Sequence, residues 1–285
     1  MSTRQERRRA ERAAKKAINK EIHPRTEVDS RTNIEYNMEA KLLQPWSAPI
    51  MATKLPDPVL GKMIEISDEI VDDKKQHKSW GHNLAGQIET ELLIPHEKLE
   101  EAGIMSFFMD TIRQFVIQCK SQMNPVQEES IRAETWLTQM LSMWIVSQFP
   151  NEYNPMHLHT QCQISSVMYL KVPKFDDSVK KHRNDDDGSI CFTGPASRDL
   201  DLSNPQWSWR PEVGDFFIFG AHQFHHVYPY KCSEGDPERR CVSFNAIFQS
   251  KSDHEAQLEA QKKQNQEADL RVVQGRDFSE SLKKL

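Results

Sequence analysis

The stretch Asn154-Pro-Met-His157-Leu-His159-Thr-Gln-Cys-Gln-Ile-Ser-Ser-Val-Met-Tyr169-Leu-Lys-Val-Pro173 decides the expected fold. His157 and His159 are two residues apart, and side chains at that spacing point to the same side of an extended chain. Both imidazoles can therefore bind one metal ion. Residues 164–172 are rich in β-branched, aromatic and aliphatic side chains and end at Pro173. This composition predicts a buried strand that runs into a loop.

A second histidine-rich segment, residues 214–229, supplies candidates for a third metal ligand. Gly214 predicts a turn, residues 216–219 predict a hydrophobic strand, and a second short extended run ends at Pro229. This pattern predicts a hairpin corner that carries three histidines, namely His222, His225 and His226. The spacing alone does not choose among them.

A third segment, residues 239–248, has the alternation of a strand with one polar and one apolar face. The apolar face consists of Val242, Phe244, Ala246 and Phe248, and the other face consists of Arg239, Cys241, Ser243 and Asn245. If the polar face lines a cavity, Arg239 points into it and Arg240 does not. A guanidinium group suits a buried carboxylate because its planar fork donates two parallel hydrogen bonds.

A metal that is held by three ligands has vacant coordination positions. Such a metal beside a carboxylate-binding arginine is typical of non-haem Fe(II) oxygenases. The order of motifs resembles the 2-oxoglutarate- and Fe(II)-dependent oxygenases of the prolyl-hydroxylase-like group. That order is His-x-His, Ser-Ser-Val-Met-Tyr-Leu, Gly-Asp followed by His-x-Val-x-Pro, and Arg followed by Ser-Phe-Asn. The likeness runs from about Pro45 to Phe248. It is greatest for oxygenases of bacteria and tailed phages that have His-x-His followed by Ser-Gly-Val-Tyr-Tyr-Leu.

The resemblance implies a role for five residues. His157 and His159 match the proximal metal ligands, and His225 matches the distal ligand through the His-x-Val-x-Pro motif. Arg239 and Tyr169 match the residues that hold the far carboxylate of 2-oxoglutarate. No catalytic residue is implied beyond the metal ligands. Arg240 is the alternative carboxylate clamp, and His222 and His226 are the alternative distal ligands.

Two positions depart from the family pattern. The wider superfamily has His-x-Asp or His-x-Glu where this chain has His-x-His, so the predicted metal site consists of three neutral imidazoles. Ser166 stands where the bacterial and phage subgroup has glycine. The first departure bears on the identity and affinity of the metal, and the second adds only a small side chain.

The resemblance further implies a double-stranded β-helix, which is a jelly-roll or cupin-like barrel, with helices of the N-terminal half packed on one face. The expected cofactors and co-substrates are Fe(II), 2-oxoglutarate and O2, and the expected reaction is a hydroxylation that releases succinate and CO2. The substrate stays open between a small molecule, a protein side chain and a modified base. Two alternatives are a three-histidine dioxygenase that does not use 2-oxoglutarate and a cupin-like binding protein without catalysis.

Composition limits the class of protein. Of the 285 residues, 37% are hydrophobic, and the mean hydropathy is −0.71. No run of eighteen apolar residues and no apolar N-terminal segment occur, so neither a transmembrane helix nor a secretory signal is expected. The five cysteines are odd in number and lack CxxC spacing, which indicates reduced thiols. We expect a cytoplasmic protein, in the host cytoplasm if it is phage-encoded, with no membrane contact.

The two ends differ from the middle. Residues 1–25 contain nine basic and three acidic side chains, a charge of +6, which leaves −11 for the rest of a chain whose net charge is −5. Residues 1–40 are therefore predicted to form a basic helical or disordered arm, which either contacts nucleic acid, a ribosome or a virion, or serves as a solubilising tail. Residues 41–250 form the predicted oxygenase domain. Residues 251–285 are predicted to be a charged helical or disordered tail outside the core.

Within the predicted domain, the order of elements is helices first and short strands afterwards. We expect a strand at 47–55, a helix at 59–71 with Asp57 as its cap, and one long amphipathic helix from 95 to about 122. Two strands joined by a tight connection are expected at 135–140 and 143–149, and further strands at 189–193 and 207–210. Residues 174–188 form a charged loop. Trp207 and Trp209 either close the barrel or stack on a substrate.

Overall fold

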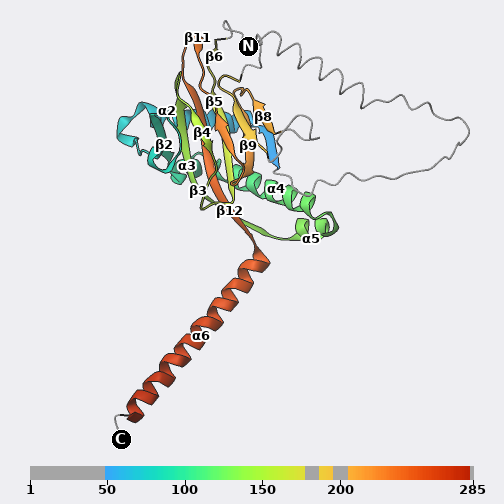
Figure 1. Cartoon of the computed structure of the whole chain (residues 1–285), viewed down its shortest axis with the longest axis vertical. Coiled ribbons are helices and arrows are strands. Elements are labelled where there is room, and N and C mark those ends of the chain that lie inside the picture. Colours follow the sequence, from blue (N-terminus) through green and yellow to red (C-terminus); the bar gives the residue numbers. More distant parts are fainter. Residues whose placement is uncertain (1–48, 177–185, 195–204, 283–285) are drawn as a thin grey trace, which may run out of the picture. The chain divides into compact units, whose positions relative to one another are not determined.

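The structure is a computed structural model that describes residues 49–176, 186–194 and 205–282 (Figure 1). The predicted basic arm, residues 1–40, and most of the charged loop at 174–188 lie outside these ranges. The arm and its contacts therefore stay predictions, as does the division of the chain at residues 40 and 250. The described residues belong to a compact unit that spans Pro45–Leu285.

The described strands and helices follow one another in an order that begins with helices and continues with strands. The strands are β1 (Ile50–Lys54), β2 (Thr90–Ile94), β3 (Trp136–Gln148), β4 (Asn154–His157), β5 (Ile164–Lys171), β6 (Lys174–Phe175), β7 (Ile190–Thr193), β8 (Gln206–Trp209), β9 (Asp215–Gly220), β10 (His225–Val227), β11 (Cys232–Glu234) and β12 (Arg239–Ser250). The α-helices are α2 (Asp57–Asp72), α3 (His96–Glu101), α4 (Met105–Met123), α5 (Glu128–Ala133) and α6 (Lys251–Leu282). Short 3-10 helices are η1 (Lys74–Gln76), η2 (Gly81–Asn83) and η3 (Pro125–Gln127).

Two antiparallel sheets make up the barrel. The larger sheet has the order β1-β9-β5-β12-β3-β2, and the smaller sheet has the order β4-β10-β7-β8. Along the chain, β3, β5, β9 and β12 of the larger sheet alternate with β4, the pair β7 and β8, and β10 of the smaller one. Eight strands that change sheets in this way form a jelly roll. The predicted fold class is therefore confirmed.

The larger sheet is buried on both faces, which explains why its strands are apolar almost throughout. One face carries Met143, Ile145, Val242 and Phe244, which belong to the same hydrophobic cluster as side chains of α2 and α4. The opposite face carries Trp144, Val146, Val167 and Tyr169, which cluster with Ile190, Phe192 and Val227 of the smaller sheet. The predicted packing of N-terminal helices on one face is confirmed, and the other face is left for the interior of the barrel.

The helix α2 begins at Asp57 because two prolines flank that residue. Pro56 occupies the N-cap position and its side chain makes no capping hydrogen bond, so the prediction of Asp57 as the cap is wrong. Proline is favoured at the first positions of a helix, where its missing N–H would have had no partner. Val59, Met63, Ile66 and Ile70 form the buried stripe of the helix.

The helix predicted from residue 95 to about 122 is two helices, because Gly103 ends the first one. Gly103 has φ +72°, a left-handed conformation in which glycine avoids the Cβ strain of other residues. Its N–H donates to the carbonyl of Glu100 at 2.9 Å, and the N–H of Ile104 donates to the carbonyl of Leu99 at 3.0 Å. These two bonds define a Schellman cap. The apolar stripe continues on both sides of the cap, which is why periodicity alone did not reveal it.

The two strands predicted at 135–140 and 143–149 are one strand, β3. Its register against β12 shifts once, since Asn245 pairs with Ser142 while Ala246 pairs with Met140. Leu141 is the extra residue of a β-bulge, and it is partly exposed. The alternation of buried and exposed residues along β3 is interrupted at Leu141. This interruption indicates a β-bulge within one strand rather than a turn between two strands.

The cysteines, the helices and two tryptophans bear on further predictions from the sequence. All five cysteines are free thiols. No helix in the described ranges is both long enough and apolar enough to cross a membrane. Residues 251–282 form a helix, which is one of the two states expected for the C-terminal tail. Trp207 stacks on Phe192, with ring centroids 5.6 Å apart, and Trp209 packs against Phe217, so these indoles lie against the interior of the barrel.

Candidate metal centre

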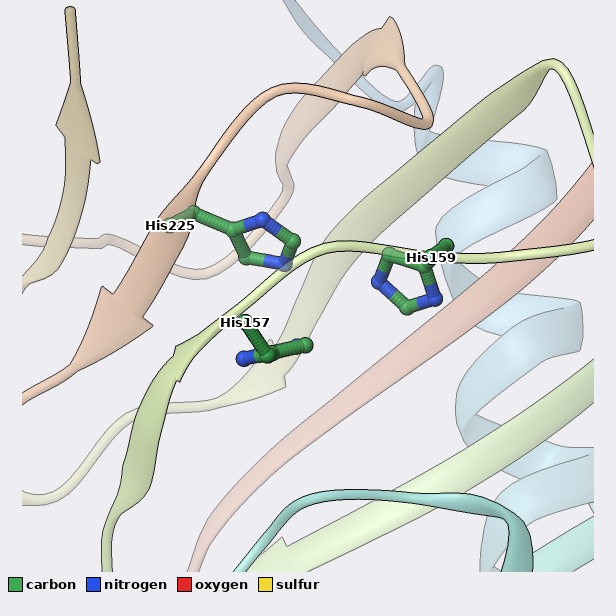
Figure 2. A group of neighbouring side chains, drawn as sticks. All are labelled: His157, His159 and His225. Carbon is green, nitrogen blue, oxygen red and sulfur yellow. The ribbon is translucent and has the colours of Figure 1, made fainter.

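Three histidines meet inside the barrel (Figure 2). His157 ends β4 and pairs in register with His225, the first residue of β10, while His159 follows two residues after β4. One ring nitrogen from each of the three lies within 4.8 Å of those of the other two. In the described parts of the chain, this is the only group of three or more His, Cys, Asp or Glu side chains that meets such a criterion.

Backbone carbonyls orient two of the rings. Nδ1 of His157 lies 2.7 Å from the carbonyl oxygen of Pro155, and Nδ1 of His225 lies 2.9 Å from that of Gln223. A carbonyl oxygen can only accept, so each Nδ1 carries the proton and donates it. The lone pair of each Nε2 is therefore left for a metal, which is the arrangement that ligating histidines in proteins have.

Burial keeps all three imidazoles neutral at pH 7. Burial lowers the pKa of His157, and it lowers the pKa of His225 well below its ordinary 6.5. Burial, with a smaller contribution from His157, lowers the pKa of His159 to about 4. Because a metal binds only the unprotonated imidazole, three neutral rings that converge at this distance fit a divalent transition metal.

Arg239 lies in the same pocket, and no acidic side chain in the described parts of the chain pairs with it. It is the first residue of β12 and is only 1% exposed. Its terminal nitrogens donate to the Gln148 side chain and, at 3.1 Å, to the Tyr169 hydroxyl, and the guanidinium lies 4.8 Å from the Tyr169 ring centroid. Its Nε has no partner, and no described carboxylate forms an ion pair with it. A buried cation without a counter-charge is costly, so this site fits an anionic ligand.

The neighbouring Arg240 is engaged in a different way. Its guanidinium binds both oxygens of Glu238, at 2.6 and 2.7 Å, and also contacts Asp68 and Ser67 of α2. These contacts fasten α2 to β12 on the helix-covered face of the sheet. The alternation along β12 thus separates the two arginines as predicted, one toward the interior and one away from it.

The pocket joins these groups. Its lining includes His157, His159, His225, Arg239, Ser243 and Cys241. The structure therefore brings together four of the five predicted site residues, and Tyr169 joins them through its hydrogen bond to Arg239.

The alternative distal ligands lie elsewhere. His222 is exposed on the corner before β10. His226 pairs with Cys191 of β7, and its ring packs on Tyr228 at 4.7 Å between centroids. Successive residues of a strand point to opposite faces, so His226 faces away from the side on which His225 meets the other two rings.

Sequence analysis missed three polar side chains near the site. Gln148 lies opposite Arg239 in register and accepts from it. Glu91 and Asn154 line the pocket. The signal for Glu91 was the segment Thr90–Ile94, which forms β2 and has one acidic residue next to the apolar Leu92, Leu93 and Ile94.

The fold and the site together define a class: a jelly-roll barrel with an interior cluster of three neutral imidazoles that could hold a metal ion and a buried arginine in the same pocket. Residues 142–245 match the model of the family described as "Putative 2OG-Fe(II) oxygenase". This segment contains all three histidines, Tyr169 and Arg239. The match bears out the predicted class of enzyme, an oxygenase that uses Fe(II), 2-oxoglutarate and O2. The likeness to the bacterial and phage subgroup stays a prediction.

Solved structures with a similar chain trace have low sequence identity. A Burkholderia pseudomallei oxidoreductase of the 2OG-Fe(II) oxygenase family is 13% identical, with a TM-score of 0.39, and the match covers 69% of this chain and 84% of that one. A Pseudomonas putida prolyl-4-hydroxylase is 15% identical, with a TM-score of 0.38 and coverage of 70% and 93%. The collagen prolyl hydroxylase of Paramecium Bursaria Chlorella virus-1, solved with 2OG, is 11% identical, with a TM-score of 0.40 and coverage of 69% and 94%. No curated protein matches this sequence.

Proposed function

We propose that this protein is an Fe(II)- and 2-oxoglutarate-dependent dioxygenase that hydroxylates its substrate and releases succinate and CO2. One observation carries the proposal: Arg239, a buried guanidinium without a described acidic partner, lines the same pocket as three neutral, convergent imidazoles. A dicarboxylate that binds a metal at one end and a guanidinium at the other satisfies both features. The family match over residues 142–245 supports this assignment.

In this proposal, His157, His159 and His225 hold Fe(II) through three neutral nitrogens. The carbonyls of Pro155 and Gln223 keep His157 and His225 in the tautomer that presents Nε2. Three ligands leave coordination positions open for a co-substrate and O2. Among the described residues, no carboxylate joins the histidine cluster as in the usual facial triad, so we expect it to hold Fe(II) less tightly than a triad does.

Arg239 is assigned to the far carboxylate of 2-oxoglutarate. The Gln148 side chain and the Tyr169 hydroxyl fix the orientation of the guanidinium, and Tyr169 also covers one of its faces. Tyr169 is fully buried, and burial raises the pKa of its phenol. The hydroxyl therefore keeps its proton and can donate a hydrogen bond to the same carboxylate.

When bound, Fe(II) with 2-oxoglutarate and O2 supplies the oxidising power for the cleavage of a substrate C–H bond. The contribution of the protein is geometric. Trp144, Phe219 and Val167 provide apolar walls of the pocket that the histidines line. The free cysteines suit a reducing compartment in which iron stays ferrous, so we propose a cytoplasmic location.

A second candidate function has one observation in its favour, which is the absence of an acidic ligand from the histidine cluster. Three-histidine dioxygenases bind their organic substrate, such as a thiol, directly to the metal and do not use 2-oxoglutarate. In such an enzyme Arg239 would bind a carboxylate of the substrate itself. O2 consumption that depends on a thiol and not on 2-oxoglutarate would identify this function.

The test compares two histidines of the same corner. We expect His225→Ala to abolish the conversion of 2-oxoglutarate into succinate, because a pair of imidazoles holds Fe(II) too weakly. The matched control is His222→Ala, which removes an exposed imidazole three residues away and is expected to keep the wild-type rate. Succinate is quantified after incubation with Fe(II) and ascorbate. Undiminished turnover in His225→Ala would exclude His225 as a ligand.

A further inference from the structure

Glu91 is a buried carboxyl group that the proposed chemistry does not use. It lies in β2 and is only 3% exposed. No hydrogen bond or ion pair links its side chain to any other described residue. It lines the same pocket as the three histidines and Arg239.

The position of Glu91 follows from the register of the larger sheet. Glu91 pairs with Val146 of β3, Val146 pairs with Cys241 of β12, and Cys241 pairs with Tyr169 of β5. Residues paired directly across antiparallel strands point to the same face. Val146, Cys241 and Tyr169 all face the interior of the barrel, so Glu91 faces it too. The next residue, Leu92, belongs to the helix-covered cluster on the opposite face.

A second oxygen faces Glu91 across a glycine. A Cβ atom at Gly86 would lie 2.8 Å from Oε1 of Glu91 and 2.6 Å from Oδ1 of Asn154. Both side-chain oxygens therefore pack against Gly86, where the Cβ of any other residue would clash with them. Asn154 also lines the pocket, and its side chain has no described hydrogen-bond partner.

The surroundings of this oxygen pair are negative. The carboxylate of Glu152 accepts hydrogen bonds from the backbone N–H groups of Glu89, at 3.0 Å, and Phe149, at 2.7 Å. Burial and, to a smaller extent, Glu152 raise the pKa of Glu91 to about 7. No described basic side chain pairs with Glu91 to offset this effect. A buried carboxylate is stable when a ligand brings donors and positive charge to it, and a neutral ligand would bring only donors.

We propose that Glu91 and Asn154 form a subsite that binds a cationic group of the substrate, a guanidinium or an ammonium. This inference deepens the proposed function, because it assigns the class of substrate that this oxygenase takes. Glu91 supplies the charge and Asn154 a second acceptor, and both oxygens come this close to residue 86 because it is a glycine. Binding at this subsite depends neither on the metal nor on 2-oxoglutarate.

The test uses two probes of the same shape, butylguanidinium and the neutral butylurea. Saturation-transfer NMR on the full-length protein, loaded with Zn(II) at pH 8, gives the dissociation constant of each probe. We expect butylguanidinium to bind at least about tenfold more tightly, which corresponds to about 1.4 kcal/mol. Glu91→Gln is expected to abolish this preference, and the control Glu89→Gln, an exposed side chain of the same segment, is expected to keep it.

A second variant, Gly86→Ala, tests the geometry without changing a charge. Its methyl group would lie 2.8 Å from Oε1 of Glu91 and 2.6 Å from Oδ1 of Asn154 and would displace these oxygens, so we expect weaker binding of butylguanidinium. Equal binding of the two probes to the wild type, no binding of butylguanidinium, or an unchanged preference in Glu91→Gln would each overturn the inference.

The two proposals fail separately. A preference for the cation in a protein that never consumes 2-oxoglutarate would leave the subsite in place and refute the oxygenase. Turnover of 2-oxoglutarate without a preference for the cation would support the oxygenase and refute the subsite.

Discussion

Arg239 and Arg240 are adjacent in the chain and have opposite roles in the structure. Arg239 lines the pocket and donates hydrogen bonds to Gln148 and Tyr169, whereas Arg240 is neutralised by Glu238 and Asp68. The alternation of β12 was sufficient to predict this difference, because a strand must send successive side chains to opposite faces. We therefore propose that Arg239 binds a ligand, whereas the two carboxylates around Arg240 fasten α2 to β12.

The two arginines should therefore respond differently to the same substitution. We expect Arg239→Met to weaken 2-oxoglutarate binding by about 100-fold or more, since each charged hydrogen bond is worth about 1.5–3 kcal/mol. We expect Arg240→Met to reduce the free energy of unfolding by about 1.5–3 kcal/mol, because buried Glu238 loses its two hydrogen bonds from the guanidinium and keeps only Lys171 and Ser147, and to change the 2-oxoglutarate affinity little. Calorimetric titration and urea denaturation of both variants check this. The opposite result, in which Arg240→Met weakens 2-oxoglutarate binding and Arg239→Met lowers the free energy of unfolding, would identify Arg240 as the residue that binds the far carboxylate.

The position of Glu91 in the pocket could not be predicted from the sequence. One acid in a short apolar segment has many explanations, and only the register of β2 against β3 turns it toward the histidines. The histidines were predictable because their spacing and the motifs around them have few other uses. Asn154 was not predicted as a site residue either, because the sequence does not show which side chain will lie opposite it.

The raised pKa of Glu91 predicts a stability effect with a definite sign. The carboxyl has a pKa of about 7 in the folded protein and an ordinary value of 4.5. Stability from the protonated form is complete below about pH 4.5 and is lost as the pH rises through 7. We expect metal-free Glu91→Gln to be about 1–3 kcal/mol more stable than the wild type at pH 8, with a much smaller difference at pH 5. Urea denaturation at both pH values measures this, and a difference that does not grow with pH would mean that the pKa of Glu91 is not raised in the folded protein.

At the scale of elements, most predicted strands and helices are present, and the two errors have local causes. Gly103 separates α3 from α4 without interrupting the apolar stripe, and Leu141 interrupts the alternation of β3 without ending the strand. Hydrophobic periodicity reports which side of an element is buried. It does not reveal a residue with a left-handed backbone conformation or a β-bulge, because the same side of the element stays buried before and after either feature.

Two glycines in the helical part give a matched test of this explanation. Gly103 has φ +72°, so we expect Gly103→Ala to destabilise the protein by about 1–2 kcal/mol. Gly61 lies within α2, and a Cβ there would meet nothing within 4 Å, so we expect Gly61→Ala to stabilise it by about 0.5–1 kcal/mol. Chemical denaturation gives both values. The same sign for both variants would contradict the role of Gly103 as a helix cap.

At the scale of the whole molecule, the site exists because two sheets face each other. Each sheet contributes part of it: β4 and β10 of the smaller sheet bring His157 and His225, while β12 and β2 of the larger sheet bring Arg239 and Glu91. Sequence analysis predicted the barrel from its motifs, and hence the meeting of residues that are about 80 positions apart. It did not predict that β2 extends the larger sheet, and for that reason it placed no carboxyl in the pocket.

The central claim is that the histidine cluster and Arg239 together hold Fe(II) and 2-oxoglutarate. The most direct measurement is the visible absorption of anaerobic protein titrated first with Fe(II) and then with 2-oxoglutarate. We predict a weak metal-to-ligand charge-transfer band that appears only when both are present and that is absent from Arg239→Met at the same concentration of 2-oxoglutarate. Bound iron with no such band at any concentration of 2-oxoglutarate would contradict the claim.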